Sequence, residues 1–152
     1  GTFLGGFLAD RLSRRNPRWG SWVVTFAILL AFPFGVTIYL VDDSKLVFAL
    51  IFIPALVGGL YLAPTFAMVQ NLVGIRMRAV AAAILLFVIN LIGMGLGPTL
   101  TGLISDVLAP TQGAHSLRYA LLIMASLNLW AALHYYLAGP KLEADYKRAL
   151  TV

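Results

Sequence analysis

The sequence contains no cysteine and little charge, and both absences narrow the class of protein. Without cysteine the chain has no disulfide, no thiolate metal site and no cysteine nucleophile. Charged residues make up only 11% of its 152 residues, whereas a soluble domain carries roughly 25%. Hydrophobic residues make up 61%, and the mean hydropathy is +0.90. A chain of this length cannot hide so much apolar surface in one core, so lipid must solvate most of it.

The residue patterns from which enzymes and nucleotide sites are built are also missing. No Ser/His/Asp set, paired carboxylates or histidine cluster occurs at a spacing that forms a catalytic or metal site. No glycine-rich loop ends in Lys followed by Ser or Thr, the phosphate-binding pattern of ATP-driven transport. We therefore expect no enzyme, no metal and no cofactor, and a membrane enzyme acting on lipid is the weakest hypothesis.

Positive charge is in excess, with a net charge of +5, but its distribution does not indicate a nucleic-acid partner. Nucleic-acid binding needs basic residues gathered on one face or stripe. Here they lie in short clusters between apolar runs. That arrangement is typical of cytoplasmic loops of a membrane protein.

Four apolar stretches are long enough to cross a hydrocarbon core of ~30 Å, which needs ~20 helical residues. They cover about 22–41, 46–73, 79–107 and 119–137, and none contains Lys, Arg or Glu. Barrel strands would alternate apolar and polar residues, whereas these stretches are continuously apolar, so we predict an all-α, polytopic transmembrane bundle. The chain opens without Met or a signal-peptide pattern. We therefore expect a fragment in which 1–9 is the end of a preceding helix.

Basic residues predict the orientation of these spans. The five segments around and between them hold four, one, two, one and three Lys or Arg, so nine of the eleven lie on one side. By the positive-inside rule that side is cytoplasmic, which makes 138–152 a cytoplasmic tail of an integral protein of a plasma or inner membrane. Aromatic side chains at the span ends fit headgroup-level anchors; they include Trp19, Trp22, Tyr135 and Tyr136.

Residues 6–15, which read Gly-Phe-Leu-Ala-Asp-Arg-Leu-Ser-Arg-Arg, resemble the signature cytoplasmic loop of the major facilitator superfamily. The family pattern is Gly, three residues, Asp, a basic residue, one residue, Gly and two basic residues. Ser13 stands where the family usually has Gly, which puts the tight turn there in doubt. The positions that match are Gly6, Asp10, Arg11, Arg14 and Arg15.

The resemblance implies that this loop closes the inward side during alternating access. Gly6 would let two helices approach closely, and Asp10 could bond a basic side chain or the positive end of a helix. Arg76 and Arg78, on the next basic loop, are the candidate partners. The alternative is that Asp10 and its arginines only set the topology and contact anionic headgroups.

Two further segments narrow the resemblance. Residues 59–65 (Gly-Leu-Tyr-Leu-Ala-Pro-Thr) and the glycine-rich run 93–106 are similar to the tenth and eleventh helices of spinster-like transporters. On that resemblance the spans would be helices nine to twelve, and residues 1–152 part of the C-terminal six-helix half of a twelve-helix carrier. A competing placement is helices three to six of an N-terminal half. It stays open because Gly93-x-x-x-Gly97-Pro98 is also similar to the Gly-Pro motif of antiporter fifth helices.

Proline and glycine interrupt the second and third spans. Proline removes a backbone donor and kinks a helix, and interrupted helices mark the pathway of many transporters, although close packing would also explain the small residues. The predicted kinks are Pro54, Pro64, Gly97 and Pro98. Helical periodicity and depth select polar or polarisable candidates for cavity contacts, each of which could instead bond between helices. These candidates are Tyr61, Thr65, Asn90 and Met94.

No ionisable residue lies at mid-depth, although such residues usually mark proton or ion sites in membranes. If transport is coupled to a proton or ion, its site is expected in the missing N-terminal half. An uncharged half-cavity suits a small organic or amphiphilic solute, lipid-like solutes included. The sequence therefore predicts a carrier in a lipid bilayer that moves its solute by secondary active or facilitative transport. This activity would need the missing N-terminal half of the same chain as a partner. The alternative is a membrane scaffold or assembly protein that transports nothing.

Overall fold

A computed structural model describes residues 1–149, so positions 150–152 of the predicted tail lie outside the described residues. All regular elements within residues 1–149 are helical, which confirms the all-α prediction. The α-helices are α1 (Thr2–Ser13), α2 (Trp19–Leu40), α3 (Ser44–Gly58), α4 (Leu62–Asn71), α5 (Arg78–Val88), α6 (Gly97–Gln112) and α7 (Ser116–Ala149). The shorter elements are the 3₁₀ turns η1 (Ile75–Met77) and η3 (Gly113–His115) and the π-helix η2 (Ile89–Leu96).

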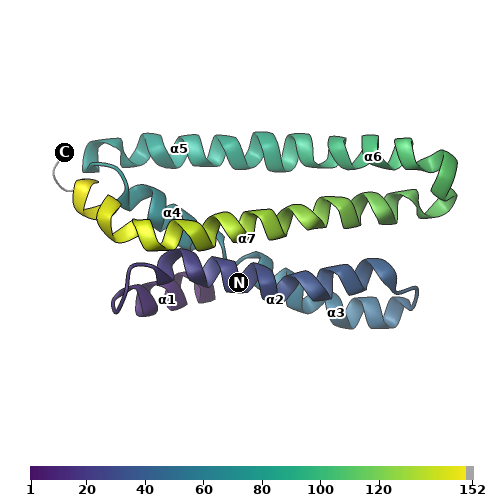
Figure 1. The fold of residues 1–152 in the computed structure, drawn as a ribbon, viewed down its shortest axis with the longest axis horizontal. Helices are drawn as coiled ribbons and strands as arrows, with labels where there is room; N and C mark the ends of the chain where they lie inside the picture. Colours follow the sequence, from purple (N-terminus) through teal and green to yellow (C-terminus); the bar gives the residue numbers. More distant parts are fainter. Residues whose placement is uncertain (150–152) are drawn as a thin grey trace.

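Three continuous helical stretches are long and apolar enough to cross a membrane: Trp19–Leu40, Ser44–Asn71 and Ile75–Ala149. The third folds back on itself, since α5, η2 and α6 form one long arm and α7 returns antiparallel beside it (Figure 1). The predicted spans 79–107 and 119–137 fall on these two arms. Residues 138–149 continue α7 as helix.

The loops predicted to share a side of the membrane lie at the same end of the bundle (Figure 1). One end, which we call the basic end, carries the α1–α2 loop, the α4–α5 junction and the end of α7. The opposite end carries the α2–α3 loop and the turn between α6 and α7. α2, the α3–α4 pair, the α5–α6 arm and α7 each run from one end of the bundle to the other, so the loops alternate between the two ends as the charge count predicts (Figure 1).

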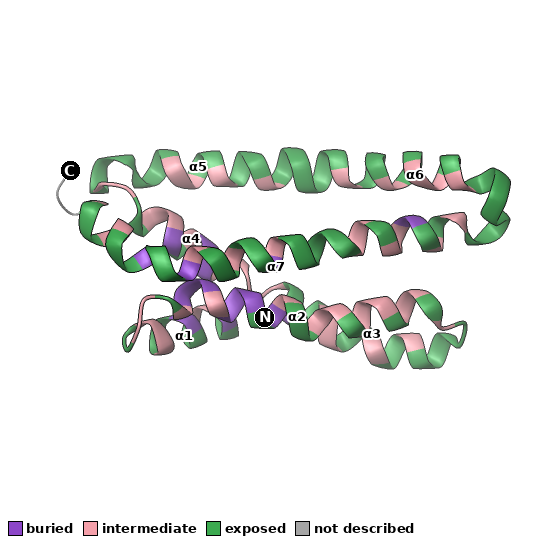
Figure 2. Ribbon diagram, in the orientation of Figure 1, coloured by how far each residue is buried: buried purple, intermediate pink, exposed green. Residues whose placement is uncertain are grey.

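The core lies where α1, α2, α4 and α7 cross, near the basic end (Figure 2). Val24 of α2 is fully buried there, and Ala132 of α7 and Met68 of α4 are 2% and 7% exposed. By contrast, none of the residues of α5, η2 or α6 is buried. This long arm touches the rest of the bundle through α4 and α7, and its other faces are apolar and open.

A side-chain bond across α2 and α7 compensates for a proline inside α7. Pro140 has no N–H, so the carbonyl of Tyr136 loses its usual donor four residues later. The indole Nε1 of Trp22 donates to that carbonyl at 3.2 Å, and its ring stacks on Tyr136 with centroids 5.6 Å apart. An unpaired carbonyl costs free energy, so this bond helps to hold α2 against α7, which is the most extensive helix contact in the bundle.

The turn between the two arms depends on Gly113. Its φ of 53° and ψ of −126° lie in a region that L side chains rarely adopt. It is the one residue with positive φ among those described. The chain reverses here, so glycine is required for the antiparallel arrangement of α6 and α7.

We expect Gly113→Ala to destabilise the folded protein by about 1–3 kcal/mol, because alanine at this φ and ψ is strained. The matched control is Gly102→Ala on α6, where an added methyl group meets nothing within 4 Å. Thermal unfolding in detergent, followed by circular dichroism, measures both. Equal unfolding midpoints for the two variants would contradict the role of Gly113.

Candidate functional site

The second predicted span is broken in its middle. α3 ends at Gly58 and α4 begins at Leu62. At the break the N–H of Leu60 donates to the carbonyl of Val57 at 2.9 Å instead of to Leu56. Pro64 has no N–H to offer the carbonyl of Leu60. The carbonyls of Leu56 and Leu60 are therefore both released from the usual helical pattern.

Gly1, which precedes α1 as its N-cap, and Gly5 within α1 pack against these two carbonyls. A methyl group added at Gly1 would overlap the Leu56 carbonyl oxygen, and one at Gly5 would overlap that of Leu60. The two glycines, four residues apart, thus face two carbonyls that are also four residues apart, and Cα–H groups at such contacts form weak bonds to oxygen. Sequence analysis selected Gly6, whose nearest neighbour is the Ala63 side chain. The Gly-x-x-x-Gly spacing of residues 1–5 was the missed signal.

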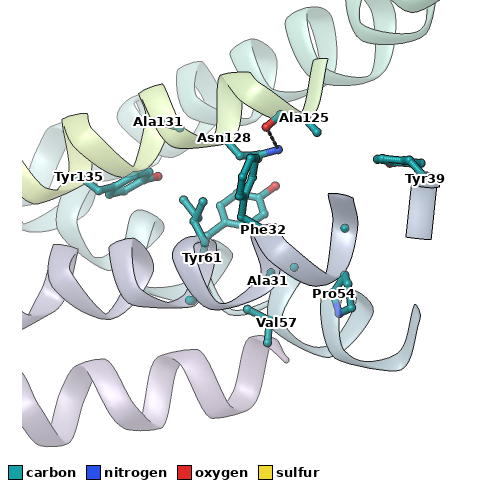
Figure 3. A pocket seen from close by; sticks show the side chains of 14 residues that line it. Ala31, Phe32, Tyr39, Pro54, Val57, Tyr61, Ala125, Asn128, Ala131 and Tyr135 are labelled. Atoms are coloured by element: carbon teal, nitrogen blue, oxygen red, sulfur yellow. Dashed lines mark hydrogen bonds between the residues drawn. The ribbon is translucent and has the colours of Figure 1, made fainter. Parts of the chain in front are cut away.

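A cavity of about 490 Å³ lies between α2, the α3–α4 break and α7 (Figure 3). No Asp, Glu, Lys, Arg or His lines it, and its polar groups are three tyrosine hydroxyls and one amide. Pro54, the predicted kink within α3, is part of its wall. The lining residues come from α2 (Ala27, Ile28, Ala31, Phe32, Gly35, Tyr39), from the α3–α4 region (Pro54, Val57, Gly58, Tyr61) and from α7 (Ala125, Asn128, Ala131, Tyr135).

Of the predicted cavity residues, Tyr61 lines this cavity, and Thr65, which does not line it, is bonded to two residues of its wall. The Thr65 hydroxyl donates to the Tyr61 carbonyl at 2.6 Å and lies 2.8 Å from the Tyr135 hydroxyl. Since the single Thr65 proton is used, Tyr135 donates to Thr65. This bond joins the broken helix to α7. The neighbouring Tyr136 is 48% exposed, and the headgroup position stays a prediction for both tyrosines.

The other two predicted cavity residues lie on a different helix. Asn90 and Met94 belong to η2, where both are exposed, Met94 at 73%. The Asn90 amide donates to the carbonyl of Leu86 on its own helix at 2.8 Å. Gly97 and Pro98 open α6 directly after this π-helix, so the predicted kink coincides with a change of helical register. The structure does not bring Asn90 and Met94 to the cavity between α2, α3 and α7.

The predicted signature loop forms the end of α1 and the start of the α1–α2 loop. Asp10, Arg11, Arg14 and Arg15 are all exposed. α1 ends at Ser13 with right-handed backbone at Arg14 (φ −60°, ψ −29°), so this turn needs no glycine. The doubt raised by Ser13 is thereby removed.

The predicted gate partners lie on the next junction of the basic end. Arg76 belongs to η1 and Arg78 opens α5, both exposed. Among the described residues, Asp10 forms no ion pair with either arginine. Asp10, Arg76 and Arg78 thus lie at the same end of the bundle, but they form no ion pair with one another among the described residues.

At the opposite end an ion pair ties two loops together. Arg118, in the first turn of α7, donates to the carboxylate of Asp42 in the α2–α3 loop. The hydrogen bond and charge of Arg118 hold the pKa of Asp42 below its ordinary value of 3.8. The pair links the α2–α3 hairpin to the start of α7 on the side where the cavity reaches Tyr39.

We predict that Tyr135→Phe lowers the stability of the bundle by about 1 kcal/mol, because it removes the donor to Thr65. Tyr136→Phe is the matched control, since it also removes one hydroxyl from α7 and leaves the ring that stacks on Trp22. Thermal unfolding midpoints in detergent compare the two. An equal midpoint for Tyr135→Phe and the wild type would show that the bond contributes nothing.

Acid should weaken the tie between Asp42 and Arg118. The pKa of Asp42 is lower in the folded than in the unfolded chain, so its contribution is complete above the unfolded value and is lost as pH falls through the folded one. Unfolding midpoints of the wild type and Asp42→Asn should therefore differ at pH 6 and converge when the pH drops below 3.8. A difference that is constant over this range would contradict the assignment.

No protein-family model matches the chain. It is 37% identical over 146 residues, or 95% of its length, to a protein named MFS-type efflux pump from Mycolicibacterium smegmatis (strain ATCC 700084 / mc(2)155). The match covers 34% of that protein, so the chain spans about a third of the length of the curated relative that it matches. The name of that protein places it among transporters of the major facilitator type, and the present chain has three helical stretches that are long and apolar enough to cross a membrane.

Proposed function

We propose that this chain is the C-terminal portion of a major facilitator carrier, spinster-like in its loop and glycine-rich segments. In this proposal α1 ends the eighth helix, and α2, α3–α4, α5–α6 and α7 are helices nine to twelve. The observation that carries the proposal is the similarity to a curated efflux pump over 95% of the chain. The broken helix beside a cavity supports it, because interrupted helices border substrate pathways in such carriers.

The chemistry of the cavity favours a small organic or amphiphilic solute. None of its fourteen lining residues is ionisable near neutral pH, and aromatic and aliphatic groups dominate the wall. Desolvating a charged solute there would cost several kcal/mol without a compensating partner. An uncharged or weakly polar molecule could instead bond to the hydroxyl of Tyr61 or the amide of Asn128. Both groups belong to the cavity wall shown in Figure 3.

Alternating access would use the basic end as one gate. We place that end at the cytoplasm, where the positive-inside rule puts most Lys and Arg residues. α1 connects this gate to the cavity, since Asp10 lies near its end and Gly5 contacts Leu60, the neighbour of Tyr61. A movement of the loop would therefore be transmitted to the broken helix. The open faces of α5, η2 and α6 would pack against the missing half of the same chain.

The experiment uses the complete polypeptide, reconstituted in proteoliposomes, with N-phenyl-1-naphthylamine, an uncharged fluorescent amphiphile, as the transported probe. Asp10→Asn should lower the initial transport rate by at least about tenfold, the effect of roughly 1.4 kcal/mol, because it removes the gate charge. The amount inserted in the membrane should not change. Asp145→Asn is the matched control, since it makes the same carboxyl-to-amide change near the basic end.

Two outcomes would contradict the proposal in different ways. Equal transport rates for Asp10→Asn, Asp145→Asn and the wild type would show that the signature loop is not a gate. An absence of flux in the wild type, for N-phenyl-1-naphthylamine and for a panel of other uncharged amphiphiles, would contradict the carrier itself. A scaffold role would then be tested by measuring the oligomeric state of the protein.

A further inference from the structure

A second hollow lies at the basic end, away from the cavity described above. It is a cleft of about 420 Å³ between the α1–α2 loop and the last turns of α7. The two segments are more than a hundred residues apart in the sequence. The cleft is lined by Arg15, Asn16, Pro17, Glu143, Tyr146 and Lys147.

The charge around this cleft is unbalanced. Lys147 donates to Glu143 at 2.8 Å, so the carboxylate within the cleft already has a cationic partner. The four arginines of the α1 end and the following loop are exposed, and within residues 1–149 none of them forms an ion pair. They are Arg11, Arg14, Arg15 and Arg18. The hydrogen bond and charge of Lys147, together with the charge of Arg18, lower the pKa of Glu143, and positive charge remains in excess around the cleft.

An anion in this cleft would have to be held by side chains, because the backbone N–H groups nearby are already used. The first N–H groups of α2 are already bonded, since Trp19 donates to Asn16 and Gly20 to Pro17, both at 3.1 Å. Asn16 accepts the N–H of Arg18 through its side-chain oxygen at 3.0 Å, so its amide NH₂ is still able to donate. The guanidinium of Arg15, the ammonium of Lys147 and this amide are donors that border the cleft, and the Tyr146 hydroxyl there is hydrogen-bonded to Asn71.

The position of the cleft suggests where an anion would come from. Trp19 and Trp22 lie edge to face with centroids 5.7 Å apart, and Trp22 stacks on Tyr136. Such aromatic groups sit at the headgroup level of a bilayer. The cleft lies next to them on the side of the basic end, where phospholipid phosphates are found.

We propose that this cleft binds the phosphate of an anionic phospholipid. Arg15 would hold the phosphate as a planar two-donor fork, with Lys147 and Asn16 beside it. A bound lipid would bridge the loop that follows α1 and the end of α7, two segments that meet around this cleft. The inference needs insertion in a membrane and does not depend on the transported solute.

The test uses the complete polypeptide in a neutral detergent, titrated with dioctanoyl phosphatidylglycerol while the thermal unfolding midpoint is followed. The midpoint should rise with this lipid and not with dioctanoyl phosphatidylcholine. Arg15→Gln should need about fivefold more lipid for half of the shift, since a basic residue near an anionic headgroup contributes about 1 kcal/mol. Because Arg15 is exposed and forms no ion pair with a described residue, its midpoint without lipid should equal that of the wild type.

Lys141→Gln is the matched control, because Lys141 is exposed near the same end of α7 but does not line the cleft. It should keep the wild-type dependence on lipid. If Arg15→Gln and Lys141→Gln needed equally more lipid, the lipid would be attracted by the overall positive charge of this end and not by a specific site, which would overturn the proposal. Equal shifts of the unfolding midpoint with phosphatidylglycerol and with phosphatidylcholine would also overturn the proposal. A shift reproduced by inorganic phosphate alone would identify a free-phosphate site and overturn the lipid assignment.

Discussion

Inside a bilayer every backbone donor and acceptor must find a partner within the protein, and this constraint organises the whole structure. The chain has seven prolines, each of which removes a backbone donor. At two of them the compensation is visible and involves a neighbouring helix. Trp22 donates to the carbonyl released by Pro140, and Gly5 packs its Cα against the carbonyl released by Pro64. The prolines thus specify which helices must be neighbours.

The same compensation connects the candidate gate to the candidate cavity. α1 carries the signature loop at one end and contacts the α3–α4 break at the other. Immediately after Leu60 the break presents Tyr61 to the cavity, and Thr65 one turn later is bonded to Tyr135 of α7. One rigid helix therefore spans the distance between loop and cavity. The long arm of α5, η2 and α6 lies outside this network and exposes apolar faces.

Features that depend on composition and period could be predicted from sequence, and features that depend on tertiary contact could not. The continuous apolar runs predicted an all-α fold. The clusters of arginine predicted which loops share a side of the membrane, and these loops lie at one end of the bundle. Tyr61 was identified as a cavity residue because depth and helical face are local properties. Asn90 and Met94 were grouped with it by depth and helical face, and these local properties cannot reveal that η2 lies outside the wall of that cavity. The bond between Tyr135 and Thr65 could not be predicted, because the two residues lie 70 positions apart in the sequence.

The central claim is that the helices from α3 to α7 cross the membrane three times, which puts the two ends of the bundle on opposite sides. It is tested most directly by labelling single cysteines with a membrane-impermeant maleimide in intact cells, and these 152 residues contain no cysteine to interfere. Ser44→Cys, at the start of α3, should be labelled from outside. Ala144→Cys, near the end of α7, should be labelled only after permeabilisation. Labelling of both positions from the same side would contradict the account.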